Sequence, residues 1–146
     1  QTYFFAEFLA RFAPGFPPGG IRGRQPAVIQ GHCHQGALAA ASLEAERALL
    51  VAVGYDAVLL DSGCCGMAGA FGLEREHAAV SREIARLGLL PRLEASPAAL
   101  VVADGFSCRE QIRQLAGRPA RHVAEVVHEA VFRSVPRVDF VMTDVK

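Results

Sequence analysis

The sequence predicts an α/β domain with a short parallel sheet and helices on both faces of that sheet. Short apolar runs alternate along the chain with longer segments of helical periodicity, and this order is typical of parallel strands joined by crossover helices. The chain has 146 residues, enough for one domain. A hydrophobic share of 51% against a charged share of 21% indicates a sizeable core and excludes intrinsic disorder.

Strands are expected at three apolar runs, residues 27–29, 57–60 and 100–103. Helices are expected between and after them, over residues 38–53, 74–89, 109–116 and 123–132. Glycine favours the position just past a helix, and proline cannot continue one. The helix ends are therefore placed at Gly54, Pro91, Gly117 and Pro136.

The first 25 residues are expected to form a helix and a Pro/Gly linker. Five phenylalanines favour a helix that packs on a preceding domain, namely Phe4, Phe5, Phe8, Phe12 and Phe16. We divide the chain into this N-terminal part (1–25), a cysteine-rich domain (26–135) and a C-terminal tail (136–146). Because the chain begins with Gln1 and shows no leader segment, we interpret it as a piece of a longer protein.

The charge balance argues against nucleic acids and anionic membranes as partners. Fifteen basic residues offset fifteen acidic ones, and no block of Lys or Arg stands out. No apolar run is long enough to span a membrane. We therefore expect a cytoplasmic protein, membrane-peripheral only through a larger complex.

Four cysteines, Cys33, Cys64, Cys65 and Cys108, each follow closely on a predicted strand. The carboxyl ends of parallel strands meet at one edge of a sheet, so we expect all four cysteines to stand on loops at that edge and their thiols to converge there. The composition favours reduced thiols over disulfides, and the adjacent Cys64 and Cys65 cannot pair without distortion. Thiolates gathered at a glycine-rich turn suit an iron–sulfur cluster or zinc. Without metal, we expect neutral thiols with pKa values near or above the ordinary one.

Residues beside the cysteines are expected to support the site. His32 and His34 flank Cys33, and on an extended strand end their side chains would point away from its thiol. We keep the hypothesis that one of the two histidines donates a hydrogen bond to a thiolate. Gly63 and Gly66 are expected to provide positive φ angles and close backbone approach.

Other polar residues have simpler interpretations. Asp61 and Asp104 are expected to cap helices or bond loops, and His77 to lie on a polar helix face. A thiol-based enzyme that uses Cys33 with His34 is disfavoured, because no third group at recognisable spacing would orient the pair.

Three segments, residues 32–35, 61–72 and 103–111, resemble the second cysteine-rich CCG domain of FAD-linked oxidases that carry their own iron–sulfur region. This domain type is shared with the glycolate oxidase iron–sulfur protein, the anaerobic glycerol-3-phosphate dehydrogenase small subunit and the CCG-containing chain of heterodisulfide reductase. The resemblance spans residues 26–131.

The resemblance implies an iron–sulfur, electron-transfer module of a flavin-linked 2-hydroxy acid dehydrogenase or oxidase, with no catalysis by this chain alone. The implied ligands are Cys33, Cys64, Cys65 and Cys108. The family motif closes with a further cysteine where this chain has Gln111, so a [4Fe–4S] cubane or a tetrahedral zinc competes with a non-cubane cluster.

The resemblance also implies the partners, which are a preceding CCG half and an FAD-carrying domain or subunit of the parent protein. The alternative interpretation is a zinc-binding structural or docking domain of the same complex. Purified in air, the isolated chain is expected to be folded and to hold zinc or no metal, because the α/β core supplies its stability.

Overall fold

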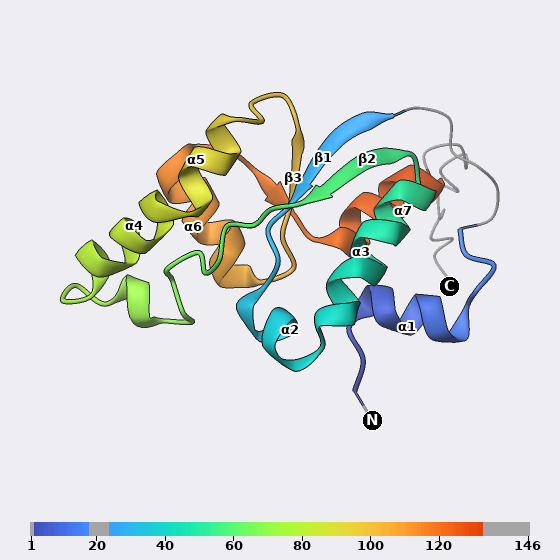
Figure 1. Cartoon of the computed structure of the whole chain (residues 1–146), viewed down its shortest axis with the longest axis horizontal. Coiled ribbons are helices and arrows are strands. Elements are labelled where there is room, and N and C mark those ends of the chain that lie inside the picture. Colours follow the sequence, from blue (N-terminus) through green and yellow to red (C-terminus); the bar gives the residue numbers. More distant parts are fainter. Residues whose placement is uncertain (1, 18–23, 133–146) are drawn as a thin grey trace, which may run out of the picture.

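The chain folds around an all-parallel sheet, seen in a computed structural model that describes residues 2–17 and 24–132 (Figure 1). In the described part the sheet has four strands in the order β2-β1-β3-β4. Ala27 of β1 pairs with Ala57 of β2 on one side and with Leu100 of β3 on the other. The strands are β1 (Gln25–Ile29), β2 (Tyr55–Leu59), β3 (Leu100–Val102) and β4 (Ala120–Arg121).

Helices cover both faces of the sheet, as the sequence predicts. The described part contains seven of them, together with a 3-10 turn, η1 (Phe71–Leu73). The helices are α1 (Phe5–Phe12), α2 (Cys33–Leu38), α3 (Ala40–Ala52), α4 (Ala78–Leu87), α5 (Leu89–Glu94), α6 (Phe106–Ala116) and α7 (Val123–Phe132). No helix among the described residues is long and apolar enough to cross a membrane.

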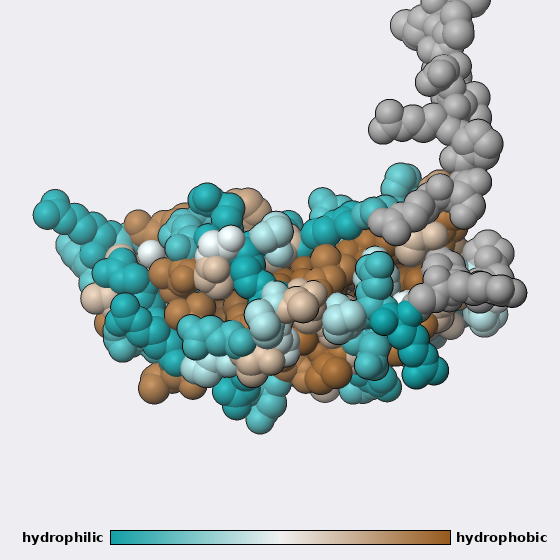
Figure 2. All heavy atoms as spheres, turned by 90° about the horizontal axis from the view of Figure 1, so that it is seen from above, coloured by the Kyte–Doolittle hydropathy of each residue, from teal (hydrophilic) through white to brown (hydrophobic). Residues whose placement is uncertain are grey.

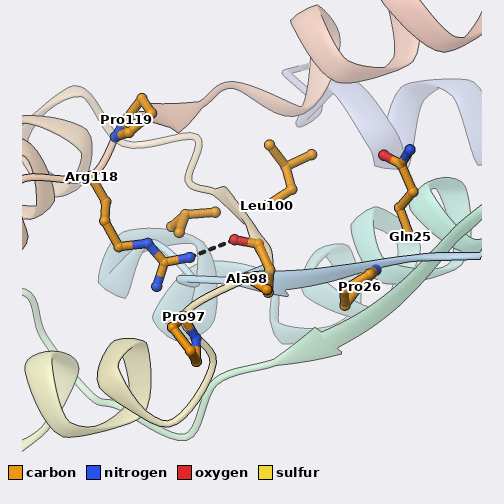
Figure 3. A pocket seen from close by; sticks show the side chains of 9 residues that line it. Gln25, Pro26, Pro97, Ala98, Leu100, Arg118 and Pro119 are labelled. Atoms are coloured by element: carbon orange, nitrogen blue, oxygen red, sulfur yellow. Dashed lines mark hydrogen bonds between the residues drawn. The ribbon is translucent and has the colours of Figure 1, made fainter.

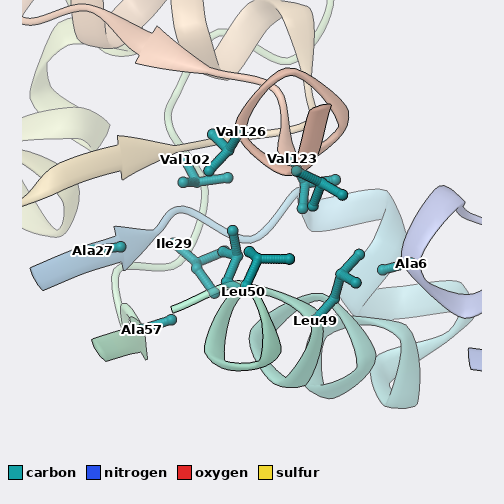
Figure 4. Close-up of a cluster of buried hydrophobic side chains, with 11 residues drawn as sticks. Ala6, Ala27, Ile29, Leu49, Leu50, Ala57, Val102, Val123 and Val126 are labelled. Carbon is teal, nitrogen blue, oxygen red and sulfur yellow. The ribbon is translucent and has the colours of Figure 1, made fainter. Parts of the chain in front are cut away.

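Two hydrophobic cores lie on opposite faces of the sheet. Successive strand residues point to opposite faces, so Ile29 packs with α3 and α7 in one core while Val28 packs with α5 and α6 in the other. Figure 4 shows the first core, where Ile29, Leu50 and Val126 are fully buried. Ala6 of α1 belongs to the same core, so this helix packs on the domain itself.

Two predicted helices differ from the structure in their bounds. The helix expected over 38–53 is present as α3 and begins two residues later, because Ala39, with a φ of −154°, is not helical and separates it from α2. The helix expected over 74–89 begins at Ala78, ends at Leu87 and is followed by α5. Pro91 lies in the first turn of α5, where its missing N–H group is not needed, and not beyond a helix end as expected.

A cavity of about 530 Å³ opens at the amino ends of β1 and β3, the edge opposite to the one where the strands end (Figure 3). Pro26, Pro97 and Leu100 form apolar walls. The Arg118 guanidinium donates to the backbone oxygens of Leu93 and Ala99, so it ties the ends of α5 and β3 together.

Apolar side chains also run along the middle of the face shown in Figure 2, with polar side chains around them. On α1, Phe8 and Phe12 are about half exposed. Residues 18–23 of the expected linker and the expected tail at 136–146 lie outside the described residues.

Candidate metal centre

The strand order places the cysteines at a topological switch point. From β1 the chain passes to β2 on one side and then crosses to β3 on the other side of β1. Connections that leave in opposite directions open a crevice beyond the carboxyl ends of such strands, where ligands bind in open α/β sheets. Cys33 follows β1, Cys64 and Cys65 follow β2, and Cys108 follows β3. All four cysteines therefore belong to this edge of the sheet.

Cys33 and Cys108 lie in first helical turns rather than in loops. Cys33 is the first residue of α2, and Cys108 is the third residue of α6. Only Cys64 and Cys65 lie in a loop, the segment that follows β2. The expectation that all four stand on loops is corrected here, because the connections after β1 and β3 turn into helices within a few residues.

The four free thiols form one group. Cys65 hydrogen-bonds with Cys108 and Cys64, and the charges of Cys65, Cys33 and Cys64 all act on Cys108. The group reaches from the surface into the protein, since Cys33 is exposed and Cys64 partly exposed, while Cys65 and Cys108 are each only 3% exposed. Residues that are 75 positions apart in the sequence thus meet in one place.

The thiols differ in how easily they ionise. The Cys108 thiol donates to Cys65 and lowers the pKa of Cys65, and the backbone N–H groups of Met67 and Ala68 add to this effect. The same hydrogen bond, together with burial, raises the pKa of Cys108. Burial raises the pKa of Cys64, partly offset by the Gly66 N–H group, which lies 3.3 Å from its Sγ. The expectation of four thiols with ordinary or raised pKa values is therefore wrong for Cys65, because the Cys108 thiol and backbone donors of the cysteine loop stabilise the Cys65 thiolate.

Glycines allow this loop to curl around the sulfur atoms, as expected. Gly63 and Gly66 have φ angles of +65° and +91°. A Cβ atom on Gly66 would lie 2.2 Å from the backbone oxygen of Ser81 in α4, so no side chain fits there.

Two buried glutamines hold the cysteine loop from opposite sides. Gln30, directly after β1, donates from Nε2 to the Gly63 oxygen at 3.0 Å and accepts a hydrogen bond from Ser62. Gln111 of α6 donates to the Cys65 oxygen at 3.0 Å and to Ser81 Oγ at 2.9 Å. Gln111 therefore supports the loop through the backbone of a cysteine. Gln30 was not singled out from the sequence, although a polar residue directly after a buried strand was a usable signal.

His32 lies between two of the cysteines. Its Nδ1 caps α2 by accepting from the His34 N–H group at 3.3 Å, and it lies 3.7 Å from Cys33 Sγ. A Cβ atom on Gly105 would meet both the His32 ring, at 2.8 Å, and Cys108 Sγ, at 3.0 Å. The expected extended geometry is wrong for Cys33 and His34, because α2 begins at Cys33 and only His32 keeps an extended backbone. The His34 ring stacks on the His32 ring with the centroids 5.3 Å apart. Burial, and secondarily His34, lower the pKa of His32.

Asp104 and His77 have the local roles expected of them, whereas the role expected of Asp61 stays a prediction. Asp104 accepts from the Val123 N–H group at 2.9 Å and so caps α7. His77 stacks on Phe71 with ring centroids 4.2 Å apart and pairs with Glu74, on a partly exposed surface. Asp61 is exposed.

The donor set fits a thiolate-bound metal in type and number, because four cysteine sulfurs complete a tetrahedral zinc site or ligate one [4Fe–4S] cluster. The side chains do not yet surround a common point. Within residues 2–17 and 24–132 no three Cys, His, Asp or Glu side chains are gathered closely enough to hold one metal ion. Binding of a metal would therefore require the thiols to turn toward a common point.

Comparisons with known proteins point to oxidoreductases. Over 121 residues, 83% of the chain, it is 31% identical to a D-2-hydroxyglutarate dehydrogenase from Pseudomonas putida. It is 36% identical over 72 residues, 49% of the chain, to the enzyme of that name from Pantoea ananatis. Over 78 residues, 53% of the chain, it is 33% identical to one subunit of the anaerobic glycerol-3-phosphate dehydrogenase from Escherichia coli.

These relatives are much longer than the chain. The matches cover 11% of the Pseudomonas protein, 7% of the Pantoea protein and 19% of the Escherichia coli protein. No family model matches the sequence, and no solved structure matches it. The chain is thus similar to one part of larger oxidoreductases of two kinds.

Proposed function

We propose that the chain is a metal-binding, electron-transfer module of a flavin-linked 2-hydroxy acid dehydrogenase or oxidase. In this proposal Cys33, Cys64, Cys65 and Cys108 bind an iron–sulfur cluster of the CCG type. The observation that carries the proposal is the group of four thiols at the switch point of the sheet, gathered from three separate connections. The similarity to parts of two kinds of dehydrogenase supports the redox role.

The residues around the thiols are suited to hold an anionic sulfur site. The N–H groups of Gly66, Met67 and Ala68 point at sulfur atoms, and such donors stabilise thiolates. Gln30 and Gln111 fix the backbone on both sides of Cys64. A bound cluster would accept and release single electrons, while these donors would hold its ligands in their charged form.

One side of the thiol group faces outward, which suits electron exchange with a partner. Cys33 is exposed, and two apolar side chains of the same edge are open to solvent. Leu38, the last residue of α2, is 81% exposed, and Phe106, the first residue of α6, is 71% exposed. We propose that a companion CCG half or the FAD-carrying part of the parent protein covers this edge.

Zinc is the second candidate occupant, in a structural or docking role within the same complex. The number of donors favours zinc, because four thiolates complete its tetrahedral coordination. Gln111 is consistent with zinc as well, because its amide binds the Cys65 backbone oxygen and the chain has no fifth cysteine at this position.

Anaerobic reconstitution distinguishes these occupants. The chain is purified without oxygen, treated with iron and sulfide, and examined for metal, sulfide and reducible visible absorption. Equal amounts of iron and sulfide, with absorption that bleaches on reduction, support the cluster. Tight zinc without sulfide supports the second candidate, and retention of neither refutes the metal centre. Each Cys→Ser variant should lower the metal content, whereas His77→Ala should not, because the His77 side chain contacts Phe71 and Glu74 rather than a cysteine.

A further inference from the structure

We propose that the cavity at the amino ends of β1 and β3 binds a small organic monocarboxylate with an apolar body, whose carboxylate pairs with the Arg118 guanidinium. Figure 3 shows this cavity, which has a volume of about 530 Å³. Small-molecule sites commonly have volumes of about 300–1,000 Å³. The cysteines belong to the opposite edge of the sheet, so this proposal does not depend on the metal centre.

The cavity has an apolar wall with one polar side chain toward each end. Three neighbouring strands open into it, since Gln25 begins β1, Leu100 begins β3 and Pro119 directly precedes β4. Prolines, alanines and aliphatic side chains form most of the lining, and its polar side chains are those of Gln25 and Arg118. In Figure 3 these two side chains lie at opposite ends, with Leu100 between them. A ligand that is charged at one end and apolar along its length matches this lining.

The positive charge of Arg118 has no acidic partner within residues 2–17 and 24–132. Its Nη1 donates to the Leu93 oxygen at 2.8 Å and its Nη2 donates to the Ala99 oxygen, and both acceptors are neutral backbone groups. No carboxylate of the described residues forms an ion pair with this guanidinium. Because Arg118 is partly buried and is the one charged residue of the lining, an anionic ligand is favoured over a neutral or a cationic one.

The two backbone bonds also fix the guanidinium and leave donors for a ligand. A guanidinium carries five N–H groups in a planar fork, and two of them are used here. The other three have no partner among the described residues. A carboxylate can accept two parallel bonds from such a fork, and these charge-assisted bonds are stronger than neutral ones. Since the side chain is already held in place, little of its conformational entropy is lost when a ligand binds.

A second cavity, of about 380 Å³, adjoins the first, since Arg118 and Pro97 line both. Leu90 and Leu115 give it apolar walls, but its lining also includes the acidic Glu94. A ligand carboxylate would be repelled there, because like charges in a partly buried site destabilise each other. The larger cavity, whose lining holds no acidic residue, is therefore the one that accepts the anion.

Titration of the full chain with hexanoate, followed by the NMR shifts of its backbone amides, tests this proposal. Hexanoate joins a carboxylate to a short apolar chain. We expect saturable shifts at Gln25, Leu100 and Val101, with a Kd of about 1 mM or below. Hexanol has the same chain without the charge, and acetate has the charge without the chain. Each should bind at least about tenfold more weakly than hexanoate.

Matched variants separate the charge of the cavity from its shape. Arg118→Gln removes the charge and keeps an amide that can donate to a backbone oxygen, so it should weaken hexanoate binding at least about tenfold and leave hexanol binding unchanged. Arg92→Gln is the control, because Arg92 is also partly buried, donates to the Gly88 oxygen at 3.2 Å and does not line either cavity. Ala98→Phe should fill the cavity and abolish binding of both compounds. Thermal melting confirms that each variant is folded, and the comparison of hexanoate with hexanol on the unaltered chain needs no variant.

Four outcomes would overturn the proposal. They are equal binding of hexanoate and hexanol, hexanoate binding that is unchanged in a folded Arg118→Gln chain, the absence of saturable shifts at Gln25, Leu100 and Val101, and tighter binding of a short acetylated peptide with a free carboxylate. The last outcome would assign the cavity to the end of a protein partner. Because the titration uses the metal-free chain, its failure leaves the proposed metal centre standing, and failure of metal binding leaves the carboxylate site standing.

Discussion

Removing the Gln111 side chain should destabilise the domain through the cysteine loop. Gln111 is 2% exposed, and its amide donates to the Cys65 oxygen, the Ser81 oxygen and Ser81 Oγ. Gln111→Ala leaves the buried Cys65 oxygen without this donor and opens a small cavity. An unsatisfied buried polar group costs about 1–3 kcal/mol, so we expect a loss of roughly 2–3 kcal/mol in the free energy of unfolding.

Gln114→Ala is the matched control, because Gln114 lies about one turn along the same helix, is exposed, and donates from its amide to the Glu110 side chain. Its replacement changes helix propensity by the same amount and should cost less than about 0.5 kcal/mol. Urea unfolding of the metal-free chain measures both variants. Equal stability of Gln111→Ala and Gln114→Ala would refute the idea that the α6 amide holds the cysteine loop.

Further predictions concern a buried acid, a glycine and the role of metal. Burial, and secondarily Asp104, raise the pKa of Glu46 to about 7, so the folded state holds its proton more tightly than the unfolded state. The protonated Glu46 carboxyl therefore stabilises the folded state fully below the unfolded pKa, and this contribution is lost as the pH rises through about 7. Glu46→Gln should flatten the pH dependence of the free energy of unfolding measured in urea. An unchanged pH dependence would contradict the raised pKa of Glu46. Gly66→Ala should lower the free energy of unfolding by at least about 2 kcal/mol, because its Cβ atom would lie 2.2 Å from the Ser81 oxygen. Gly69→Ala is the control: its Cβ atom would meet no described atom within 4 Å, and it should cost about half as much in the same assay. Similar losses in the two variants would argue against the clash. Thermal melts with a strong chelator should remain cooperative, because two hydrophobic cores flank the sheet, and a lost transition would show that metal holds the fold.

The architecture followed from the sequence because local patterns and tertiary packing agree in most of the chain. Helix α7 begins and ends at the predicted residues 123 and 132. Gly88 shows where local patterns were not enough. A Cβ atom there would lie 2.1 Å from the Ser62 oxygen, so contact with the cysteine loop requires glycine at the break between α4 and α5. Strand β4 has two residues, too few for an alternating pattern to show.

The convergence of the cysteines followed from parallel topology, whereas the support around them depends on contacts between distant residues. Gln111 was noticed as a substituted ligand position, but only the fold shows that its amide reaches the Cys65 oxygen. The lowered pKa of Cys65 has the same origin, since its thiol partner Cys108 is 43 positions away and its backbone donors depend on how the loop curls. The sequence analysis treated the chain as extended through Cys33, so it did not predict that His32 caps a helix that begins at Cys33.

X-ray absorption of the metal-loaded chain tests most directly whether all four thiols serve one centre. We expect four sulfur neighbours for each zinc at roughly 2.3 Å, or an all-sulfur shell with short metal–metal distances for an iron–sulfur cluster. In the Cys33→Ser chain one sulfur neighbour should disappear while metal stays bound more weakly. A shell with nitrogen or oxygen ligands in the unaltered chain, or a sulfur count that does not change in Cys33→Ser, would contradict the shared centre.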